Sequence, residues 1–579
     1  MWDEGNDIVT DLQGNIYIAG EYYNNSIFPG GANADVTASS GGNNKSYLAK
    51  YDNCANLLWV AFSDNLMAPD HDRSTALVLD ENQNSVYIVG EFSNRIHFNG
   101  GIGDFAGPAS DLFTIGATNQ GYIARFDMDD GTIQDIETVT LNTITSITSI
   151  TVHENIGHIY IGGQSGPFVG ADKIFIQRYH TDPSLIGVLD WTVESAYLST
   201  VNLMDLDFDE TLGPEGSVWA TGSFRKGLRL IGADIITTTG KSDAYVVRIE
   251  DATTPLSQPV FENGNISGRM FGQGIVSDDN GHAFLTGYYI GMTTTAFNMI
   301  GGQILPFVSS TEPNAYFVAM HADGTPQWAN ARYGGSVFGE VLGLAVSISG
   351  DHVVFAGTYQ DTDMEFDGTE LLPYVAGTPN DQSHIFAVSY KASNGDYEWS
   401  NASIEDPGDD ALHIPHAVAT DSLGHAFITG GFSIEMGYLV GTPASGEITT
   451  AGQWATFGMR VELDPAGAFQ TPATDANYAP PLYGVEAPLI QTGEPTKLKI
   501  YPNPASDQLT IELPNLNKAY QITLVDITGR VIMQTDVKSD YSENLTWDTK
   551  SVANGTYLIL MRDALTYESI IIQHVVISH

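Results

Sequence analysis

Alternating carboxylates are the residues of this 579-residue sequence whose type and spacing could do chemistry. Asp361, Asp363, Glu365 and Asp367 alternate along one segment and precede Gly368. Carboxylate oxygens are the ligands that Ca²⁺ prefers, so these four residues form a candidate calcium site. The segment lacks the closing glutamate of a full calcium-binding loop, and alternate acids also fit the solvent face of a strand. Calcium is therefore a possible ligand, and no other cofactor is identified.

Two other segments are rich in acids. Asp127, Asp129 and Asp130 precede Gly131 on a turn and are a second possible calcium site, also without a full calcium-binding loop. Residues 205–210 alternate acids in the same way but carry less weight, because they align with the first strand of their unit. Paired carboxylates for glycoside cleavage could be drawn from any of these, but so many acids make chance pairs unavoidable. The sequence has no Gly-x-Ser-x-Gly elbow, no His-Glu-x-x-His helix and no phosphate-binding glycine loop. It assigns no catalytic residue and favours a role other than an enzyme.

The net charge of −47 is concentrated in the N-terminal part of the chain. From Lys497 onward 7 basic residues face 9 acidic ones, which leaves 16 basic and 61 acidic residues before it. Such acidity opposes binding to nucleic acids or anionic lipid and fits a solubilised surface in salty water. No apolar run is long enough for a membrane helix. The single cysteine, Cys54, excludes an internal disulfide and predicts a buried free thiol.

The elements that must position these groups form a repeat. A strand, a turn of the form Asp-x-x-Gly-Asn/His and a second strand ending at glycine recur in the segments 11–20, 278–287 and 421–430. Variant copies end at Gly90, Gly163, Gly222 and Gly357, so successive glycines lie 70, 73, 59, 65, 70 and 73 residues apart. Spacing this regular indicates a repeat architecture.

Each unit continues with two further strands. The third strands are predicted at 47–51, 122–126, 174–179, 245–249, 316–320, 386–390 and 457–461. Fourth strands often carry tryptophan, namely Trp59, Trp191, Trp328 and Trp399. Four antiparallel strands repeated seven times predict an all-β fold with a seven-bladed β-propeller over residues 1–470. Strands such as 86–89 are apolar on both faces, as expected of a blade packed between two neighbours.

The repeat resembles the SBBP-type propeller repeat of secreted bacterial proteins, most specifically in its Asp-x-x-Gly-Asn-x-Tyr-x-x-Gly string. That resemblance implies a fold and no single activity. His158, His282 and His425 follow a glycine at equivalent places in different units. Equivalent positions lie far apart around a ring, so each histidine is expected to bond its own turn and none to join the others in a metal site.

A proline-rich segment and a small β-domain end the chain. Residues 471–496 contain five prolines and are predicted to be a linker. Short strands at 508–513, 520–525, 531–535 and 555–561, separated by turns, predict a small Ig-like β-sandwich over 497–579.

The sandwich resembles the C-terminal type A sorting domain of the Bacteroidetes type IX secretion system. The matching residues are Tyr501, Pro502, Asn503 and Pro504, the turn with Asp526 and Gly529, and the segment with Gly555 and Tyr557. The resemblance implies recognition by the type IX machinery and a secreted or cell-surface location. The family's lysines in the last strand are missing here.

We interpret the chain as an exported propeller that binds a glycan or a surface protein through the loops 24–45, 94–120, 291–314 and 361–383, because these differ between units. The alternative is a secreted hydrolase or lyase with its site on the central propeller face. The opening residues 1–6 have neither the basic segment nor the apolar core of a signal peptide, so we expect that the signal was removed or that the sequence as given is truncated. Since the seventh unit lacks its tryptophan strand, we expect an N-terminal extension that supplies a signal and completes that blade.

Overall fold

The computed structural model of this chain divides into two compact units. The first comprises 1–448 with 454–485 and the second comprises 449–453 with 486–579. The described residues are 3–31, 33–53, 55–63, 71–99, 112–113, 120–139, 144–166, 173–181, 188–196, 201–213, 215–225, 227–230, 236–237, 242–251, 257–262, 269–278, 280–290, 297–298, 304–305, 313–332, 340–360, 364–366, 370–372, 383–404, 413–421, 425–432, 435–438, 447–449, 455–461, 499–501, 505–506, 508–512, 520–526, 531–537, 545–550, 552, 555–563 and 569–577. The predicted linker 471–496 and Cys54 lie outside them.

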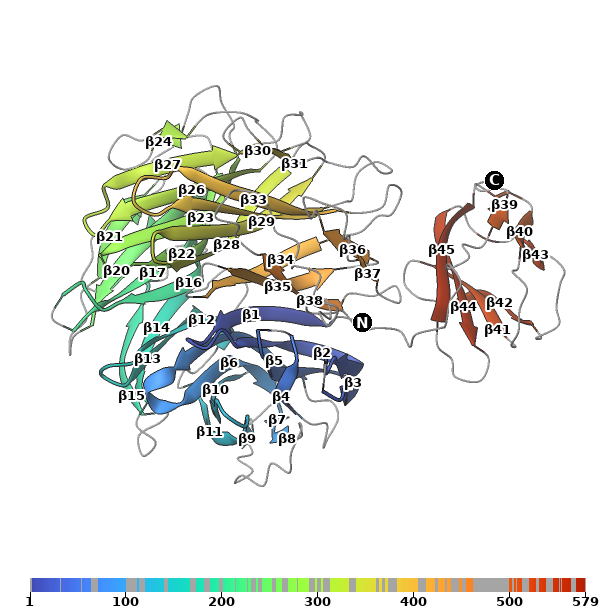
Figure 1. Cartoon of the computed structure of the whole chain (residues 1–579), viewed down its shortest axis with the longest axis horizontal. Coiled ribbons are helices and arrows are strands. Elements are labelled where there is room, and N and C mark those ends of the chain that lie inside the picture. Colours follow the sequence, from blue (N-terminus) through green and yellow to red (C-terminus); the bar gives the residue numbers. More distant parts are fainter. Residues whose placement is uncertain are drawn as a thin grey trace. The chain divides into compact units, whose positions relative to one another are not determined.

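Antiparallel sheets make up the first unit (Figure 1). The first three consist of β1 (Glu4–Thr10), β2 (Ile16–Phe28), β3 (Val36–Tyr51) and β4 (Leu57–Ser63); β5 (His71–Asp80), β6 (Ser85–Ser93), β10 (Gln120–Asp127) and β11 (Ile133–Thr138); and β12 (Ile144–His153), β13 (His158–Ser165), β14 (Lys173–His180) and β15 (Leu189–Glu194). A 3-10 turn, η1 (Glu81–Gln83), joins β5 to β6.

Four more sheets follow the same order. They consist of β16 (Val201–Asp209), β17 (Ser217–Phe224), β20 (Asp243–Glu250) and β21 (Ser257–Glu262); β22 (Arg269–Ser277), β23 (His282–Ile290), β26 (Asn314–His321) and β27 (Pro326–Arg332); β28 (Glu340–Ser349), β29 (His352–Gln360), β32 (His384–Lys391) and β33 (Tyr397–Ile404); and β34 (His413–Thr420), β35 (Ala426–Phe432) and β38 (Ala455–Val461).

Short strands accompany these sheets, and three of them extend one: β8 (Phe98–Asn99) pairs with β4 in the first sheet, and β36 (Glu435–Tyr438) with β37 (Glu447–Thr449) follows β33 in the sixth. The others are β7 (Arg95–Ile96), β9 (Leu112–Phe113), β18 (Gly227–Leu228), β19 (Ile236–Thr237), β24 (Phe297–Asn298), β25 (Ile304–Leu305), β30 (Met364–Phe366) and β31 (Glu370–Leu372). The segment 24–45, expected as a loop, is mostly an extension of the β2–β3 hairpin, because the two strands pair from Phe28 and Val36 onward. Most of the other three expected loops lies outside the described residues.

The first strand of each sheet lies beside the first strands of its neighbours. The succession runs β1, β5, β12, β16, β22, β28 and β34, and β34 lies beside β1 again, as Figure 1 shows. Thr10 of β1 donates its hydroxyl to the carbonyl of Thr420 in β34 at 3.1 Å. Each of these first strands therefore contacts two others, and the last one contacts the first.

Seven apolar clusters fill the spaces between successive sheets. Strand β6 shows how one strand serves two of them: Val86 and Ile88 belong to the cluster shared with the first sheet, and Tyr87 and Val89 to that shared with the third. All four side chains are fully buried. Burial on both faces explains the continuous apolar runs of the repeat.

The predicted third and fourth strands are present, and two of the four tryptophans link neighbouring sheets. The indole nitrogen of Trp59 donates to the carbonyl of Met128 at 3.1 Å, and that of Trp328 donates to the carbonyl of Ala392 at 2.9 Å. In both cases the acceptor lies in the turn that follows the third strand of the next sheet.

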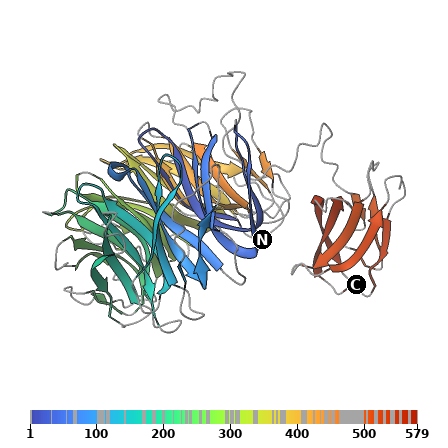
Figure 2. The ribbon, with the colours of Figure 1, turned by 90° about the horizontal axis from the view of Figure 1, so that it is seen from below.

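The second unit contains two antiparallel sheets, which Figure 2 shows as two layers. One consists of β39 (Lys499–Tyr501), β40 (Gln508–Glu512) and β43 (Leu545–Asp548), and the other of β41 (Tyr520–Asp526), β42 (Val531–Val537), β44 (Gly555–Asp563) and β45 (Ser569–Ile577). Leu509, Ile511, Ile522, Trp547 and Ile559 are buried between them. The chain is all-β, and no helix in its described part is long and apolar enough to cross a membrane.

Candidate functional site

The first strand of each of the seven sheets, here called the inner strand, carries a β-bulge at an equivalent position. The pairing with the second strand shifts by one residue there. The extra residues are Asn6, Thr75, Thr148, Met204, Gln273, Leu344 and His416. A bulge bends a strand and redirects one side chain, so the repeat places seven such residues at equivalent positions.

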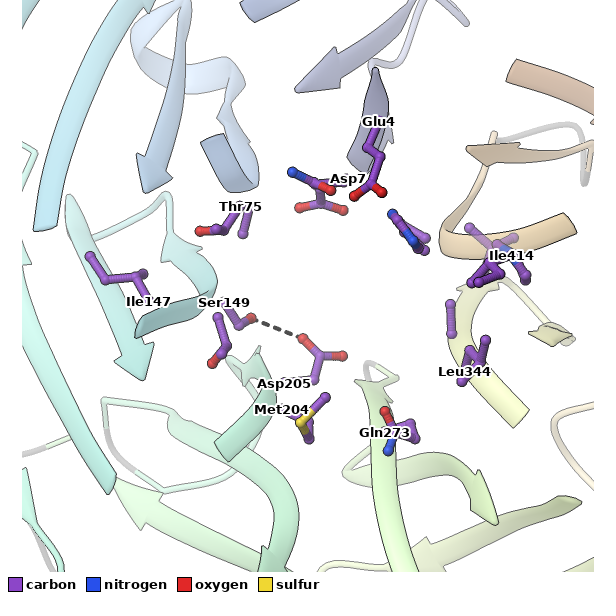
Figure 3. A pocket seen from close by; sticks show the side chains of 18 of the residues that line it. Glu4, Asp7, Thr75, Ile147, Ser149, Met204, Asp205, Gln273, Leu344 and Ile414 are labelled. Atoms are coloured by element: carbon purple, nitrogen blue, oxygen red, sulfur yellow. Dashed lines mark hydrogen bonds between the residues drawn. The ribbon is translucent and has the colours of Figure 1, made fainter. Parts of the chain in front are cut away.

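These seven residues line one pocket of about 540 Å³. All seven inner strands contribute to its wall, and Figure 3 shows side chains from most of them facing a common space. The lining combines amides and hydroxyls with apolar groups such as Ile414 and Pro415. We call this the axial pocket. It can supply hydrogen bonds and apolar contact together, as ligand sites commonly do.

The glycine that recurs on the second strand of each sheet is required by the bulge on the first strand. Gly222 pairs with Leu203 directly before the bulge, and a Cβ atom on it would stand 2.2 Å from the carbonyl oxygen of Asn202. The same clash, at 1.9–2.2 Å, would arise at Gly20, Gly90, Gly163, Gly287, Gly357 and Gly430. Each of the seven glycines therefore leaves space for the main-chain carbonyl of the residue two before the bulge.

A tyrosine of the third strand often completes this arrangement. Tyr245 donates its hydroxyl to the Asn202 carbonyl at 2.8 Å, and Tyr316 donates to the Phe271 carbonyl at 3.0 Å. These are the carbonyls that the glycines admit. Each bond gives a hydrogen-bond donor to a main-chain carbonyl beside the bulge, and buried main-chain acceptors require such partners.

Two carboxylates at the axial pocket bind the neighbouring sheet. Asp7 accepts the backbone N–H of Leu77 at 2.7 Å, and Asp205 accepts that of Ile275 at 2.9 Å. Asp205 also accepts the Ser149 hydroxyl at 2.9 Å (Figure 3). Burial raises the pKa of Asp7 and of Asp205 to about 7, despite these hydrogen bonds. Both side chains therefore act as links between sheets.

One sector of the pocket wall is acidic. Arg73 pairs with Glu91 at 2.7 Å, and Glu91 also accepts the backbone N–H of Ile147 at 2.7 Å. Glu4 and Glu21 lie opposite each other on β1 and β2, and burial raises the pKa of both carboxyls. Glu4, Glu21 and Arg73 line this sector, whereas Glu91 lies in the wall of a smaller neighbouring pocket. With more carboxyls than guanidinium groups, the sector favours neutral or cationic ligands over anions.

A smaller pocket of about 160 Å³ shares Glu21 and Arg73 with the axial pocket. Asp72 in its wall forms a fully buried ion pair with Lys45 at 3.0 Å and accepts the Ser63 hydroxyl. Breaking such a pair leaves an uncompensated buried charge, so this pair acts in stability.

The predicted calcium site cannot be placed. Asp361, Asp363 and Asp367 lie outside the described residues, and Glu365 lies in β30 with its side chain undescribed. The turn Asp127–Gly131 is described: Asp127 accepts the backbone N–H of Asp129 at 2.9 Å and the Gln134 amide at 3.1 Å. Its carboxyl group thus bonds its own hairpin.

The histidine prediction is confirmed at two of three positions. His282 contacts Asp278 at 2.9 Å and His425 contacts Asp421 at 2.7 Å, each within its own turn. For His158 the prediction is wrong. Its nearest carboxylates are Asp190 and Asp251, because Glu154 at the turn position binds the N–H of Glu81 instead.

Sequence reasoning missed the pocket residues for a physical reason. The seven bulge residues are of six different types, so no motif marks them. Their common signal is the glycine on the paired strand. Asp205 was given little weight because it lies in a first strand, yet that strand lines the pocket.

The sorting residues are distributed over the second unit. Tyr501 ends β39 and is 44% exposed, Asp526 ends β41, Gly555 begins β44 and Tyr557 is buried in the core. Outside the described residues lie Pro502, Asn503, Pro504 and Gly529.

Residues 499–576 match the family model described as "Secretion system C-terminal sorting domain". The C-terminal unit contains a type IX sorting domain. This domain implies interaction with the type IX secretion machinery and a secreted or cell-surface location. The match covers residues 499–576 only.

Comparison with known proteins adds little on the first unit. The sequence matches none of the curated proteins with which it was compared. Among solved structures, a plexin A4 full extracellular region shares 7% identity with a TM-score of 0.32, covering 87% of this chain and 66% of its own. A glycoside hydrolase family 32 protein from Bifidobacterium adolescentis shares 9% identity with a TM-score of 0.24, covering 100% of this chain and 93% of its own.

Proposed function

We propose that the chain is an exported ligand-binding protein built on a closed seven-bladed β-propeller. The sorting domain supports export, since such a tail directs a protein to the type IX machinery. The domain limits 1–470, 471–496 and 497–579 and the SBBP-type repeat are part of this proposal.

Contacts between the first and last sheets support ring closure. Ala419 and Phe427 of the last sheet share an apolar cluster with Ile8, Ile16 and Ile18 of the first. Together with the hydrogen bond between Thr10 and Thr420, this joins the two ends of the repeat array. Stacked units that cannot bury their own faces gain a continuous core in this way.

The axial pocket is the observation that carries the binding role. Each sheet gives it one bulge residue, so a rigid repeat presents seven side chains of six types to one ligand. Amides and hydroxyls beside apolar groups suit a glycan or an uncharged polar segment of a surface protein. The predicted loops after the second strand of each blade would extend this surface.

The hydrolase or lyase alternative has weaker support. Glycoside cleavage needs one carboxyl that donates a proton and one that attacks or activates water. Asp7 and Asp205 instead accept backbone N–H bonds from adjacent sheets. Their raised pKa values have burial as the main cause, and structural networks produce such shifts as well.

A glycan array probed with the full secreted chain tests the binding role. We expect retention of a defined glycan class, weakened at least about tenfold by Asn6→Ala with Gln273→Ala, which corresponds to about 1.4 kcal/mol. Asn280→Ala, on an exposed turn outside the pocket lining, is the control. Release of shortened glycans would support the hydrolase, and neither binding nor cleavage of glycans or of extracted surface protein would refute both.

A further inference from the structure

Three side chains with metal-binding atoms meet at one end of the third sheet. His158 begins β13, His180 ends β14, and the two are paired across the strands. Asp190 lies in β15 at a register shift beside them. One donor atom from each lies within 4.8 Å of the other two. Among the described residues, a search for three or more His, Cys, Asp or Glu side chains with donor atoms this close together finds these three.

We propose that His158, His180 and Asp190 bind a divalent transition-metal ion, with Zn²⁺ as the best fit. Zinc takes imidazole and carboxylate ligands at about 2.0–2.2 Å in tetrahedral geometry, which puts neighbouring donor atoms about 3.3 Å apart. The distance from Asp190 to the Nε2 atom is 2.8 Å for His180 and 3.8 Å for His158. Small side-chain rotations convert these separations into a coordination sphere.

Residues behind the ligands hold them in place. Arg178 donates to one oxygen of Asp190 at 3.1 Å, while the other oxygen faces His180. Asp251 pairs with Arg178 at 2.5 Å and lies 3.6 Å from Nδ1 of His158. A carboxylate beyond the second ring nitrogen is the usual support of a metal-binding histidine.

The charge of this group also favours a cation. Two carboxylates, Asp190 and Asp251, face one guanidinium, so the cluster is negative when both histidines are neutral. His158 is buried, whereas His180 and Asp190 reach solvent, which leaves a route for the ion and a coordination position for water.

The fifth sheet provides an internal comparison. His282 and His321 are paired as His158 and His180 are, with ring centroids 5.1 Å apart against 5.2 Å. There, however, Gln327 occupies the place of Asp190, and His282 is bound to Asp278 of its own turn. The two sheets thus share the histidine pair, and of the two only the third has a carboxylate as the third ligand.

The test is titration of the full chain with Co²⁺ and Zn²⁺ after removal of metals with a chelator. The tetrahedral absorption of bound Co²⁺ separates this site from weak octahedral binding on the acidic surface. We expect one equivalent to give that spectrum and equimolar Zn²⁺ to displace it. Asp190→Asn and His180→Asn should each weaken affinity at least about tenfold.

His321→Asn is the matched control and should keep full affinity. Near-ultraviolet circular dichroism confirms that each variant keeps its native packing, and two variants at partly exposed positions guard against misfolding of one. Absence of the tetrahedral spectrum in the native chain would overturn the proposal. Equal loss in His321→Asn, or retention in both ligand variants, would overturn it as well.

Discussion

The hydroxyl of Tyr245 donates a 2.8 Å hydrogen bond to the main-chain carbonyl of Asn202, across the space that Gly222 leaves open. This contact joins the first, second and third strands of one sheet. Because the carbonyl belongs to the residue two before the bulged Met204, the glycine and the tyrosine together stabilise the strand that lines the axial pocket.

Gly222→Ala should destabilise the first unit strongly. Its methyl group would meet the Asn202 oxygen at 2.2 Å and the Tyr245 hydroxyl at 2.8 Å, so the bulge must shift. We expect a loss of about 1–3 kcal/mol or more in the free energy of unfolding, measured by denaturant titration. Gly350→Ala is the control: no atom lies within 4 Å, and the positive φ costs about 1–2 kcal/mol. A smaller loss at Gly222 than at Gly350 would contradict this account.

The sequence predicts the repeat better than the pocket. Regular spacing of Gly90, Gly163 and their equivalents, with apolar strands between, was sufficient for an all-β fold of repeated antiparallel sheets. The sequence does not show why glycine is needed at these positions. The atom that a side chain would meet there is a main-chain carbonyl oxygen, which every residue type has.

Cross-strand neighbours are equally hidden in a sequence. His158, His180 and Asp190 come together through pairing register, and no short motif joins residues so spaced. The histidine prediction succeeded at His282 and His425, where the partner lies four residues away.

Stability should fall as pH rises from about 4 to about 7, in part through Asp205. Its pKa is about 7 in the folded chain because of burial, against 3.8 as the ordinary value. Between these values the folded state holds a proton that the unfolded state has lost, so the free energy of unfolding decreases with rising pH. Asp205→Asn should reduce this slope, as measured by unfolding at several pH values.

Asp323→Asn is the control for that slope. The Thr325 hydroxyl lowers the pKa of the exposed Asp323, which therefore titrates below this window. An unchanged slope in Asp205→Asn, or the same change in both variants, would show that Asp205 does not titrate as described.

Trp328→Phe should weaken the junction between the fifth and sixth sheets. It removes the 2.9 Å bond to the Ala392 carbonyl and part of the ring that packs on Gly395. We expect a loss of about 1–3 kcal/mol, because a buried acceptor is left unsatisfied. Trp399→Phe is the comparison, since the Trp399 indole nitrogen has no hydrogen-bond partner among the described residues. Equal thermal shifts in both would argue against a specific role for the Trp328 bond.

Calcium binding at Asp361, Asp363, Glu365 and Asp367 remains a proposal with a direct test. A bound ion stabilises by mass action, by about 2.7 kcal/mol at a concentration a hundredfold above Kd. Thermal unfolding of the full chain in millimolar calcium should then occur at a higher temperature than in chelator, and less so in Asp363→Asn with Asp367→Asn. If the native chain unfolds at the same temperature in calcium and in chelator, these acids do not bind calcium and are simply solvated.

Export by the sorting domain is the central claim, and localisation of the protein tests it most directly. The full chain behind a signal peptide is produced in a Bacteroidetes host and in a matched strain without a working type IX system. A second chain ends before Glu486, where the second unit resumes. We predict that the competent host exports the full chain. The full chain should stay in the periplasm of the strain without a working type IX system, and the shortened chain should stay in the periplasm of both strains. Periplasmic retention of the full chain in the competent strain, with a native substrate still exported, would contradict the account, and so would export of the shortened chain.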